Sequence, residues 1–294
     1  FKPVRRADLS YDERRRAIRS LMFLKEKFTP SGKFQKLKAR LVADGSRQDR
    51  TISNDSSSPT ASVPALFTVF GIAAAEGRDV ASLDITGAYL NAKADKSKAP
   101  IHVIITPDMV KWILEMYPEY RQYISDDGNI YAELERAMYG TVEASRQWYD
   151  DLTEGLEKDG FARNSHEKCI FNKTVDGNQV TVVVYVDDLI ITSKDPDLVT
   201  STINMLKERY VEVTSARGDT HEYVGMVFQL NGDKGVKVSM TKYLSNILEE
   251  FGTEGTSTSP ATSKLFNERE SPLLDTKRAK QFHTTVGSFL GFQR

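Results

Sequence analysis

Short runs in which apolar and polar residues alternate recur along the chain, and they predict β-strands joined by tight turns. MFLKEKF and FQKLKARLVA flank the turn signal TPSGK at 29–33, which predicts a β-hairpin. IFNKTVDGNQVTVVVYVDDLIITS contains two more hairpin signals, one at Asp176-Gly177 and one at Asp187-Asp188. EYVGMVFQL and GVKVSM, on either side of Asn231-Gly232, predict another hairpin. Single strands are predicted for VASLDI and for IHVIIT at 101–106.

Longer segments with apolar residues at helical spacing separate these strands. ALFTVFGIAAAEG ends at Gly77 and EASRQWYDDLTEGLEKDG ends at Gly160, as helices that close on glycine do. Strands and helices follow one another without regular βαβ spacing, which favours an α+β fold over a doubly wound sheet. Further helices are predicted at 11–27, 197–210, 243–252 and 276–290, and polar loops or linkers at 44–60 and 253–263.

The composition is ordinary for a globular chain, with 39% hydrophobic and 28% charged residues. Its 294 residues suffice for two or three subdomains of ~100–150 residues each. The longest apolar run, around 182–186, is far shorter than the ~20 residues that span a bilayer, so no membrane partner is expected. Cys169 is the only cysteine, which excludes an internal disulfide and indicates a reducing compartment. The sequence starts at Phe1 and not at Met, so we expect a piece of a longer protein.

The net charge of −1 conceals a basic N-terminal segment. Residues 1–50 contain 15 Lys and Arg against 6 Asp and Glu, including RRR at 14–16 and KFQKLKAR at 33–40. Clustered cations suit a polyanionic partner, because phosphate neutralisation releases counterions. A solvated charged helix explains the same composition equally well.

Two adjacent carboxylates, Asp187 and Asp188, interrupt an otherwise apolar hairpin. Like charges repel and buried carboxylates are costly, so this pair indicates a bound cation. Hard oxygen ligands favour Mg²⁺, and a two-metal site needs more than one carboxylate anchor, which predicts a third Asp from another strand. Asp84, at the end of VASLDI, is the best third ligand. The alternatives are a helix N-cap or turn role for Asp84 and a solvent-exposed turn for the pair.

Several ordered motifs resemble those of reverse transcriptases, and the closest group is the copia type of LTR retrotransposon. Tyr185–Asp188 resembles the YxDD box, and LDITGAYLN at 83–91 resembles the other palm box. Lys38–Gly45 resembles the KARLVA-G segment of the copia type. Residues 137–149 resemble its ALYGLKQAPRxWY box, and EYVGMVFQL stands where the family has its primer-grip hairpin. The likeness runs from about residue 20 to residue 292.

This resemblance implies a right-hand polymerase whose palm is an antiparallel, ferredoxin-like or RRM-like sheet with helices on one face. The palm would comprise residues 60–91 and 148–230, the fingers residues 1–59 and 92–147, and the thumb residues 231–294. The implied reaction is the template-directed addition of deoxynucleotides to a primer 3′-OH. Its partners are an RNA or DNA template with its primer strand and deoxynucleoside triphosphates.

The resemblance also implies roles for individual residues. Asp84 and Asp187 would bind two Mg²⁺ ions, with Asp188 completing the cluster and Mn²⁺ as the alternative metal. Lys38 and Arg40, which share a strand face, would clamp the β- and γ-phosphates. A solvated edge strand is the rival interpretation, and it is preferred for Lys33 and Lys36. The resemblance also implies that Ile85, Tyr89 and Glu143 contact the nucleotide. Tyr89 would be a gate against the 2′-OH, and the alternative is an ordinary core tyrosine. The implied primer contacts are Tyr185, Tyr223, Gly225 and Met226.

Glu143 departs from the family pattern, because the copia-type box has Gln at this position. An ionised Glu only accepts hydrogen bonds and places negative charge near a triphosphate. We therefore expect it to pair with Arg146 or Lys38, or else the nucleotide binds more weakly.

Other residues point less clearly to chemistry. Trp148 and Tyr149 are expected to pack a palm helix, and a solvated helix is favoured over duplex contact for Lys277, Arg278 and Lys280. Zinc is not expected, because the four histidines, His102, His166, His221 and His283, lack metal-ligand spacing with Cys169.

The resemblance places the chain in a polyprotein whose RNase H and integrase segments would be its partners. It implies a location in cytoplasmic virus-like particles, with the nucleus as a second site. Two rival functions remain: a host-adapted reverse transcriptase, and a non-catalytic descendant that binds nucleic acid.

Overall fold

The structure is a computed structural model that describes residues 1–28, 33–48, 57–251, 255–256, 258–259 and 272–292. Most of the predicted turn at 29–33, much of the loop at 44–60 and most of the linker at 253–263 lie outside the described residues. The chain divides into two compact units, residues 1–62 with 78–217 and residues 63–77 with 218–294. The predicted division into fingers, palm and thumb uses other boundaries and stays a prediction.

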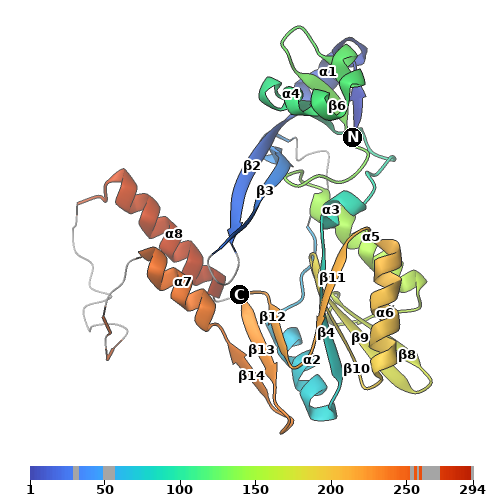
Figure 1. The fold of residues 1–294 in the computed structure, drawn as a ribbon, viewed down its shortest axis with the longest axis vertical. Helices are drawn as coiled ribbons and strands as arrows, with labels where there is room; N and C mark the ends of the chain where they lie inside the picture. Colours follow the sequence, from blue (N-terminus) through green and yellow to red (C-terminus); the bar gives the residue numbers. More distant parts are fainter. Residues whose placement is uncertain (29–32, 49–56, 252–254, 257, 260–271, 293–294) are drawn as a thin grey trace. The chain divides into compact units, whose positions relative to one another are not determined.

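The larger sheet of the first unit has six strands in the order β11-β4-β10-β9-β8-β7 (Figure 1), and all neighbouring strands are antiparallel. Along the chain, β4, α5, β9, β10, α6 and β11 follow in the βαββαβ order of a ferredoxin-like fold. The predicted α+β class and antiparallel sheet are therefore confirmed. The bounds are β4 Asp79–Ile85, α5 Ala144–Lys158, β7 Ala162–Arg163, β8 Ile170–Val175, β9 Asn178–Tyr185, β10 Asp188–Ser193, α6 Pro196–Arg209 and β11 Val213–Arg217.

The centre of this sheet is buried because its strands are rich in Val, Ile, Leu and Thr. Next to the turn between β9 and β10, Tyr185, Asp187 and Asp188 are partly exposed, and Asp84 on the neighbouring β4 is exposed. Helix α5 buries one side, including Trp148 and Tyr149, so the prediction that these two residues pack a helix is confirmed.

A second sheet of the first unit has the order β1-β6-β5-β2-β3, and β2 runs parallel to β5. Ile18, Val103, Ile105 and Ile130 form its core with helix α4, which the sequence analysis missed. The bounds are β1 Lys2–Val4, α1 Tyr11–Arg16, β2 Ile18–Phe28, β3 Phe34–Ala43, α3 Ala88–Asn91, β5 His102–Ile105, α4 Pro107–Met116 and β6 Ile130–Glu133.

The predicted helix at 11–27 is wrong beyond Arg16. Ser10 and Glu13 form a capping box that starts a helix of only six residues, Tyr11–Arg16. From Ile18 onward the chain pairs with β3 on one side and with β5 on the other. Strand pairing with distant residues therefore outweighs the helical propensity of the charged segment.

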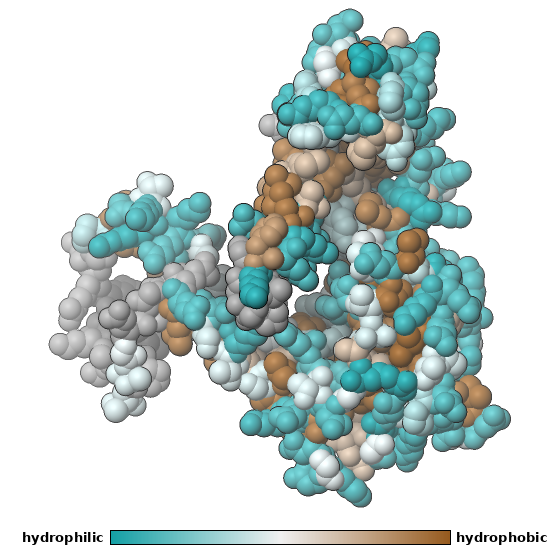
Figure 2. Space-filling view, in the orientation of Figure 1, coloured by the Kyte–Doolittle hydropathy of each residue, from teal (hydrophilic) through white to brown (hydrophobic). Residues whose placement is uncertain are grey.

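Strands β2 and β3 form a long hairpin with two chemically different faces. Cross-strand partners share a face, and the register pairs Lys25 with Lys38 and Lys27 with Lys36. We call the face that carries Lys25, Lys27, Lys36, Lys38 and Arg40 the basic face. The opposite face carries Met22, Leu24, Leu37 and Leu41, and Figure 2 shows apolar side chains exposed along this hairpin.

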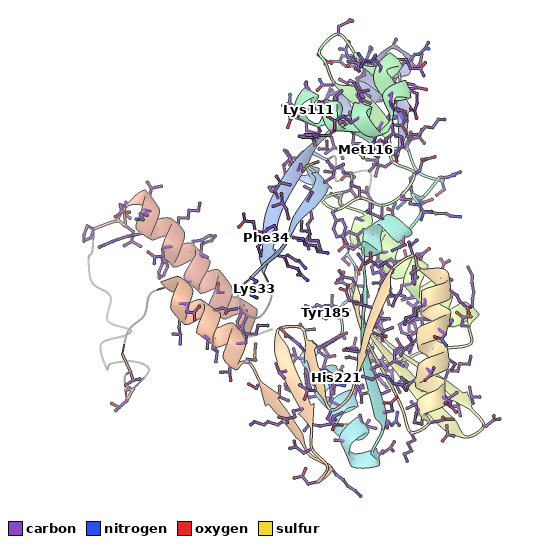
Figure 3. The ribbon with its side chains drawn as sticks, viewed as in Figure 1. Lys33, Phe34, Lys111, Met116, Tyr185 and His221 are labelled. Atoms are coloured by element: carbon purple, nitrogen blue, oxygen red, sulfur yellow. The ribbon has the colours of Figure 1, made fainter. Side chains whose placement is uncertain are left out.

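The second unit combines helix α2 with a three-stranded antiparallel sheet, β12-β13-β14. Phe70 of α2 stacks on Phe228 with ring centroids 4.0 Å apart, and His221 (labelled in Figure 3) packs beside Phe70. EYVGMVFQL is not one strand as predicted, because Val224 and Gly225 both have positive φ and form a turn within it. The bounds are α2 Val63–Glu76, β12 Thr220–Tyr223, β13 Met226–Leu230, β14 Val236–Ser239, α7 Thr241–Phe251 and α8 Thr276–Phe292.

In the part of the chain that the structure describes, no helix combines the length and apolar character needed to cross a membrane.

Candidate active site

Sheet register brings together the three carboxylates that the sequence analysis grouped. Asp84 near the end of β4 lies directly opposite Asp188, the first residue of β10. Asp187 occupies the turn before Asp188, and its carbonyl accepts a hydrogen bond of 3.0 Å from the Ile85 amide. Figure 3 labels Tyr185, the last residue of β9, which pairs with Asp188 across the turn. We call Asp84, Asp187 and Asp188 the acid cluster.

Burial and neighbouring negative charge both act on the acid cluster. Burial raises the pKa of Asp188 to about 6, and the negative charges of Asp187 and Asp84 act in the same direction. Burial also raises the pKa of Asp187, with Asp84 adding to the effect, whereas a backbone hydrogen bond, Arg40 and Lys38 oppose it. Both carboxyl groups would ionise more easily beside added positive charge.

The donor chemistry of the cluster suits Mg²⁺, because a hard divalent cation prefers carboxylate oxygens. The carboxylates are adjacent, yet among the described residues no three His, Cys, Asp or Glu side chains already converge closely enough to hold a metal ion. The residues therefore fit the ion in the kind of ligand atom they offer, while the structure does not show them gathered around one point. Their final coordination would have to form when the ion binds.

Cations of the hairpin act on the acid cluster. The pKa of Lys38 is lowered by burial first and then by Arg40 and Lys27, and the charge of Asp84 opposes this shift. Arg40 in turn lowers the pKa of Asp187. Lys38 and Arg40 are thus within electrostatic range of the acid cluster.

Two glycines fix the end of β3 against residues 139–141. A Cβ on Gly45 would lie 1.9 Å from the Gly140 carbonyl oxygen, and a Cβ on Gly140 would lie 2.0 Å from the Ala43 carbonyl oxygen. The Ala43 amide donates a hydrogen bond of 2.7 Å to the Tyr139 carbonyl. This close backbone approach holds the strand that carries Lys38 and Arg40.

Tyr89 and Tyr139 form a ring pair beside the acid cluster. Tyr89 lies on α3, its ring centroid is 4.5 Å from that of Tyr139, and the two planes are tilted by 32°. Burial raises the pKa of both hydroxyls, and the charge of Asp187 contributes to each shift. The sequence analysis missed Tyr139 as a site residue, although it lies next to Gly140 in the segment 137–149 that resembles the copia-type box.

The structure places the side chains of two predicted nucleotide-binding residues, Ile85 and Glu143, in contacts that the sequence analysis did not expect. The Ile85 side chain is fully buried, on the face of β4 opposite to Asp84, so only its backbone remains at the site. Glu143 is 7% exposed and accepts a hydrogen bond from Gln48, whose side-chain oxygen accepts one from the Val142 amide. The expected pairing of Glu143 with Arg146 or Lys38 is wrong, since Arg146 pairs with Asp150 and Glu143 has no cation partner among the described residues. Its own nucleotide contact stays a prediction.

The predicted primer residues fall in both compact units. Tyr185 belongs to the first unit, at the end of β9. Tyr223 and Met226 belong to the second unit, where they pair across the turn that contains Gly225 and are 3% and 5% exposed. Their primer contacts stay predictions.

Comparison with known families agrees with the motifs. The family model described as reverse transcriptase (RNA-dependent DNA polymerase) matches residues 9–263. The chain therefore belongs to this reverse transcriptase family, and the relatives that follow confirm the resemblance to the copia type.

The relatives are transposon proteins of plants and yeast. The retrovirus-related Pol polyprotein from transposon RE1 of Arabidopsis thaliana is 25% identical over 224 residues, which are 76% of this chain and 14% of that protein. The polyprotein from transposon TNT 1-94 of Nicotiana tabacum is 24% identical over 74% of this chain and 15% of its own length. The putative transposon Ty5-1 protein of Saccharomyces cerevisiae is 24% identical over 71% of this chain and 62% of its length. The chain thus spans only about one seventh of the two plant polyproteins.

Solved structures with similarity include a foamy viral protease-reverse transcriptase in complex with double-stranded DNA. It is 14% identical, with a TM-score of 0.42, over 91% of this chain and 37% of that chain. The telomerase of Candida albicans, in complex with a fragment of telomeric RNA, is 8% identical with a TM-score of 0.42, over 79% and 47% of the two chains.

Proposed function

We propose that the chain is an RNA-directed DNA polymerase that extends a primer 3′-OH with deoxynucleotides, as part of the Pol polyprotein of an LTR retrotransposon. The observation that carries this proposal is the register between β4 and β10, which joins Asp84 to the Asp187-Asp188 turn. Membership of the reverse transcriptase family supports the same reaction.

Asp84 and Asp187 would hold two Mg²⁺ ions, and Asp188 would complete the cluster. When bound, these ions supply the charge that activates the primer hydroxyl and neutralises the triphosphate. The chain's own contribution is to keep three carboxylates close together despite their mutual repulsion, so that ion binding offsets this repulsion.

Lys38 and Arg40 would bind the β- and γ-phosphates of the incoming nucleotide. Both lie on the basic face of the hairpin, and their charges already act on the acid cluster. Arg can bind phosphate through two parallel hydrogen bonds, whereas Lys acts as a point charge.

Tyr89 would exclude a 2′-OH from the nucleotide site. Its ring is held against Tyr139 and lies within range of the Asp187 charge, so it borders the place where the reacting sugar would bind. A fixed ring discriminates by collision, which a mobile side chain could not do.

In the parent polyprotein, RNase H and integrase segments would act on the product of this chain. The reaction would take place in cytoplasmic virus-like particles, and the nucleus is the second location proposed.

Primer extension on an RNA template with labelled primer, with and without Mg²⁺, tests the proposal. The wild-type chain should extend the primer only with Mg²⁺, and Asp187→Asn should reduce the rate at least a thousandfold. Asp176→Asn is the control, since Asp176 is an aspartate in the other tight turn of β9, and it should extend normally. A wild-type chain that binds the primer-template and never extends it would favour the non-catalytic alternative.

A further inference from the structure

The turn that carries Asp187 contains a strained residue. Val186 and Asp187 join β9 to β10, and Val186 has a φ of 59°. A β-branched residue seldom adopts this left-handed conformation, and hairpin turns of this length favour Gly, Asn or Asp where φ is positive. Such a conformation persists only where neighbouring groups enforce it.

Two hydrogen bonds from outside the hairpin hold this turn. The indole Nε1–H of Trp148 donates to the Val186 carbonyl at 2.6 Å, and the Ile85 amide donates to the Asp187 carbonyl at 3.0 Å. The Val186 carbonyl belongs to the peptide plane that leads into Asp187. Fixing this carbonyl therefore fixes the backbone from which the Asp187 carboxylate projects.

The indole is itself held rigidly. Trp148 lies on α5, is 1% exposed, and packs edge-to-face against Tyr210 with ring centroids 5.2 Å apart. The Tyr210 hydroxyl donates to Asp151, one turn further along α5, at 3.1 Å. The donor is thus preorganised, because neither its helix nor its ring can turn away without breaking buried contacts.

We propose that Trp148 is a positioning residue that enforces the strained Val186-Asp187 turn and so aims the Asp187 carboxylate. This inference rests on the proposed polymerase function. A purely packing role would need only an aromatic ring at position 148, whereas this role needs the indole N–H. Small displacements of a reacting group can cost about a hundredfold in rate.

Trp148→Phe removes the donor and keeps an aromatic ring. Its matched control is Tyr149→Phe, which removes a buried hydroxyl that donates to the Lys168 carbonyl from the next residue of the same helix. Trp148→Phe should lower kcat at least tenfold, change the KM for deoxynucleotide less than twofold, and raise the Mg²⁺ concentration for half-maximal rate several-fold. Tyr149→Phe should stay within twofold of wild type in all three. Equal effects of the two variants on kcat would overturn the proposal.

Relief of the strain should replace the hydrogen bond. Val186→Gly removes the Cβ that opposes positive φ, so Trp148→Phe should be less harmful to kcat and to the urea midpoint in a Val186→Gly background. Equal effects in both backgrounds would show that Trp148 does not act through the turn.

Hydrogen exchange of ¹⁵N-labelled indoles gives a measurement independent of activity. The chain has two tryptophans, and Trp112 is 52% exposed. The Trp148 indole hydrogen should exchange at least a hundredfold more slowly than that of Trp112, and comparable rates would refute the hydrogen bond. A wild-type chain that does not extend primers refutes the proposed function instead, and the exchange and urea measurements still decide the role of Trp148.

Discussion

Replacing Gly140 with Ala tests how firmly the end of β3 is fixed. Gly140 has a φ of 92°, and a Cβ there would lie 2.0 Å from the Ala43 carbonyl oxygen. Ordinary contacts begin at 3.4 Å, so the backbone of one segment must move by more than an ångström. That movement would also disturb the hydrogen bond from the Ala43 amide to the Tyr139 carbonyl.

Gly177→Ala separates the two causes of instability in this experiment. Gly177 has a φ of 80° and nothing within 4 Å of an added Cβ, so its variant bears only the conformational penalty. That penalty is about 1–2 kcal/mol for a left-handed residue. Gly140→Ala adds an overlap that typically costs about 1–3 kcal/mol, which gives a total loss of roughly 2–5 kcal/mol.

Urea unfolding, followed by tryptophan fluorescence, measures both variants in the first unit, because Trp112 and Trp148 both belong to it. The midpoint of Gly140→Ala should lie roughly 0.5–1 M below that of Gly177→Ala. Because β3 carries Lys38 and Arg40, Gly140→Ala should also raise the KM for deoxynucleotide several-fold. Equal urea midpoints for the two variants would refute the close backbone approach.

Three further outcomes follow from the site and its surroundings. In metal-free buffer at pH 7.5, Asp188→Asn should leave the urea midpoint unchanged or higher while it abolishes primer extension, because it removes a half-buried charge that repels Asp187. Tyr89→Ala should increase ribonucleotide incorporation relative to deoxynucleotide at least tenfold. Burial is the main cause that lowers the pKa of His102 below 6.5, so the neutral ring stabilises the fold above pH 6.5 and this stability is lost as the pH falls. Wild type should therefore lose more stability than His102→Gln between pH 7 and pH 5.

Each of these outcomes has a contrary result. A clearly lower urea midpoint for Asp188→Asn would mean that the carboxylate stabilises the metal-free fold. Unchanged sugar discrimination in Tyr89→Ala, with Tyr89→Phe as the control that keeps the ring, would exclude the gate. Parallel pH profiles of the melting temperature for wild type and His102→Gln would show that His102 is not protected from protonation.

The acid cluster could be predicted from the sequence because adjacent carboxylates between two apolar strands have few physical roles other than binding a cation. The pair Asp187-Asp188 predicted a cation, a cation predicted a third carboxylate, and the register places Asp84 opposite Asp188. The hairpins at Asp176-Gly177 and Asp187-Asp188 were predicted for a similar reason, since polar residues break long runs of Val and Ile.

The remaining features depend on contacts between distant residues. The turn at Val224-Gly225 was indicated only by the resemblance to a primer-grip hairpin, because valine rarely has positive φ and the alternating pattern favours one strand. Part of the segment predicted as a helix at 11–27 is strand β2, because it pairs with the distant strand β5. The partner of Glu143 is Gln48, which lies within a segment predicted only as a polar loop. Tyr139 belongs to the site because its ring contacts that of Tyr89, which is distant from it in the sequence.

The neighbouring positions of β4 and β10 in the sheet have a consequence for how the protein is made. A growing chain presents Asp84 long before the ribosome has added Asp188, and α2 precedes its sheet partners by an even longer stretch. Such distant pairings slow folding, because the entropy of closing a long loop is lost before the stabilising contacts form. Prematurely terminated copies that end before Asp187 consequently contain Asp84 as the single member of the acid cluster.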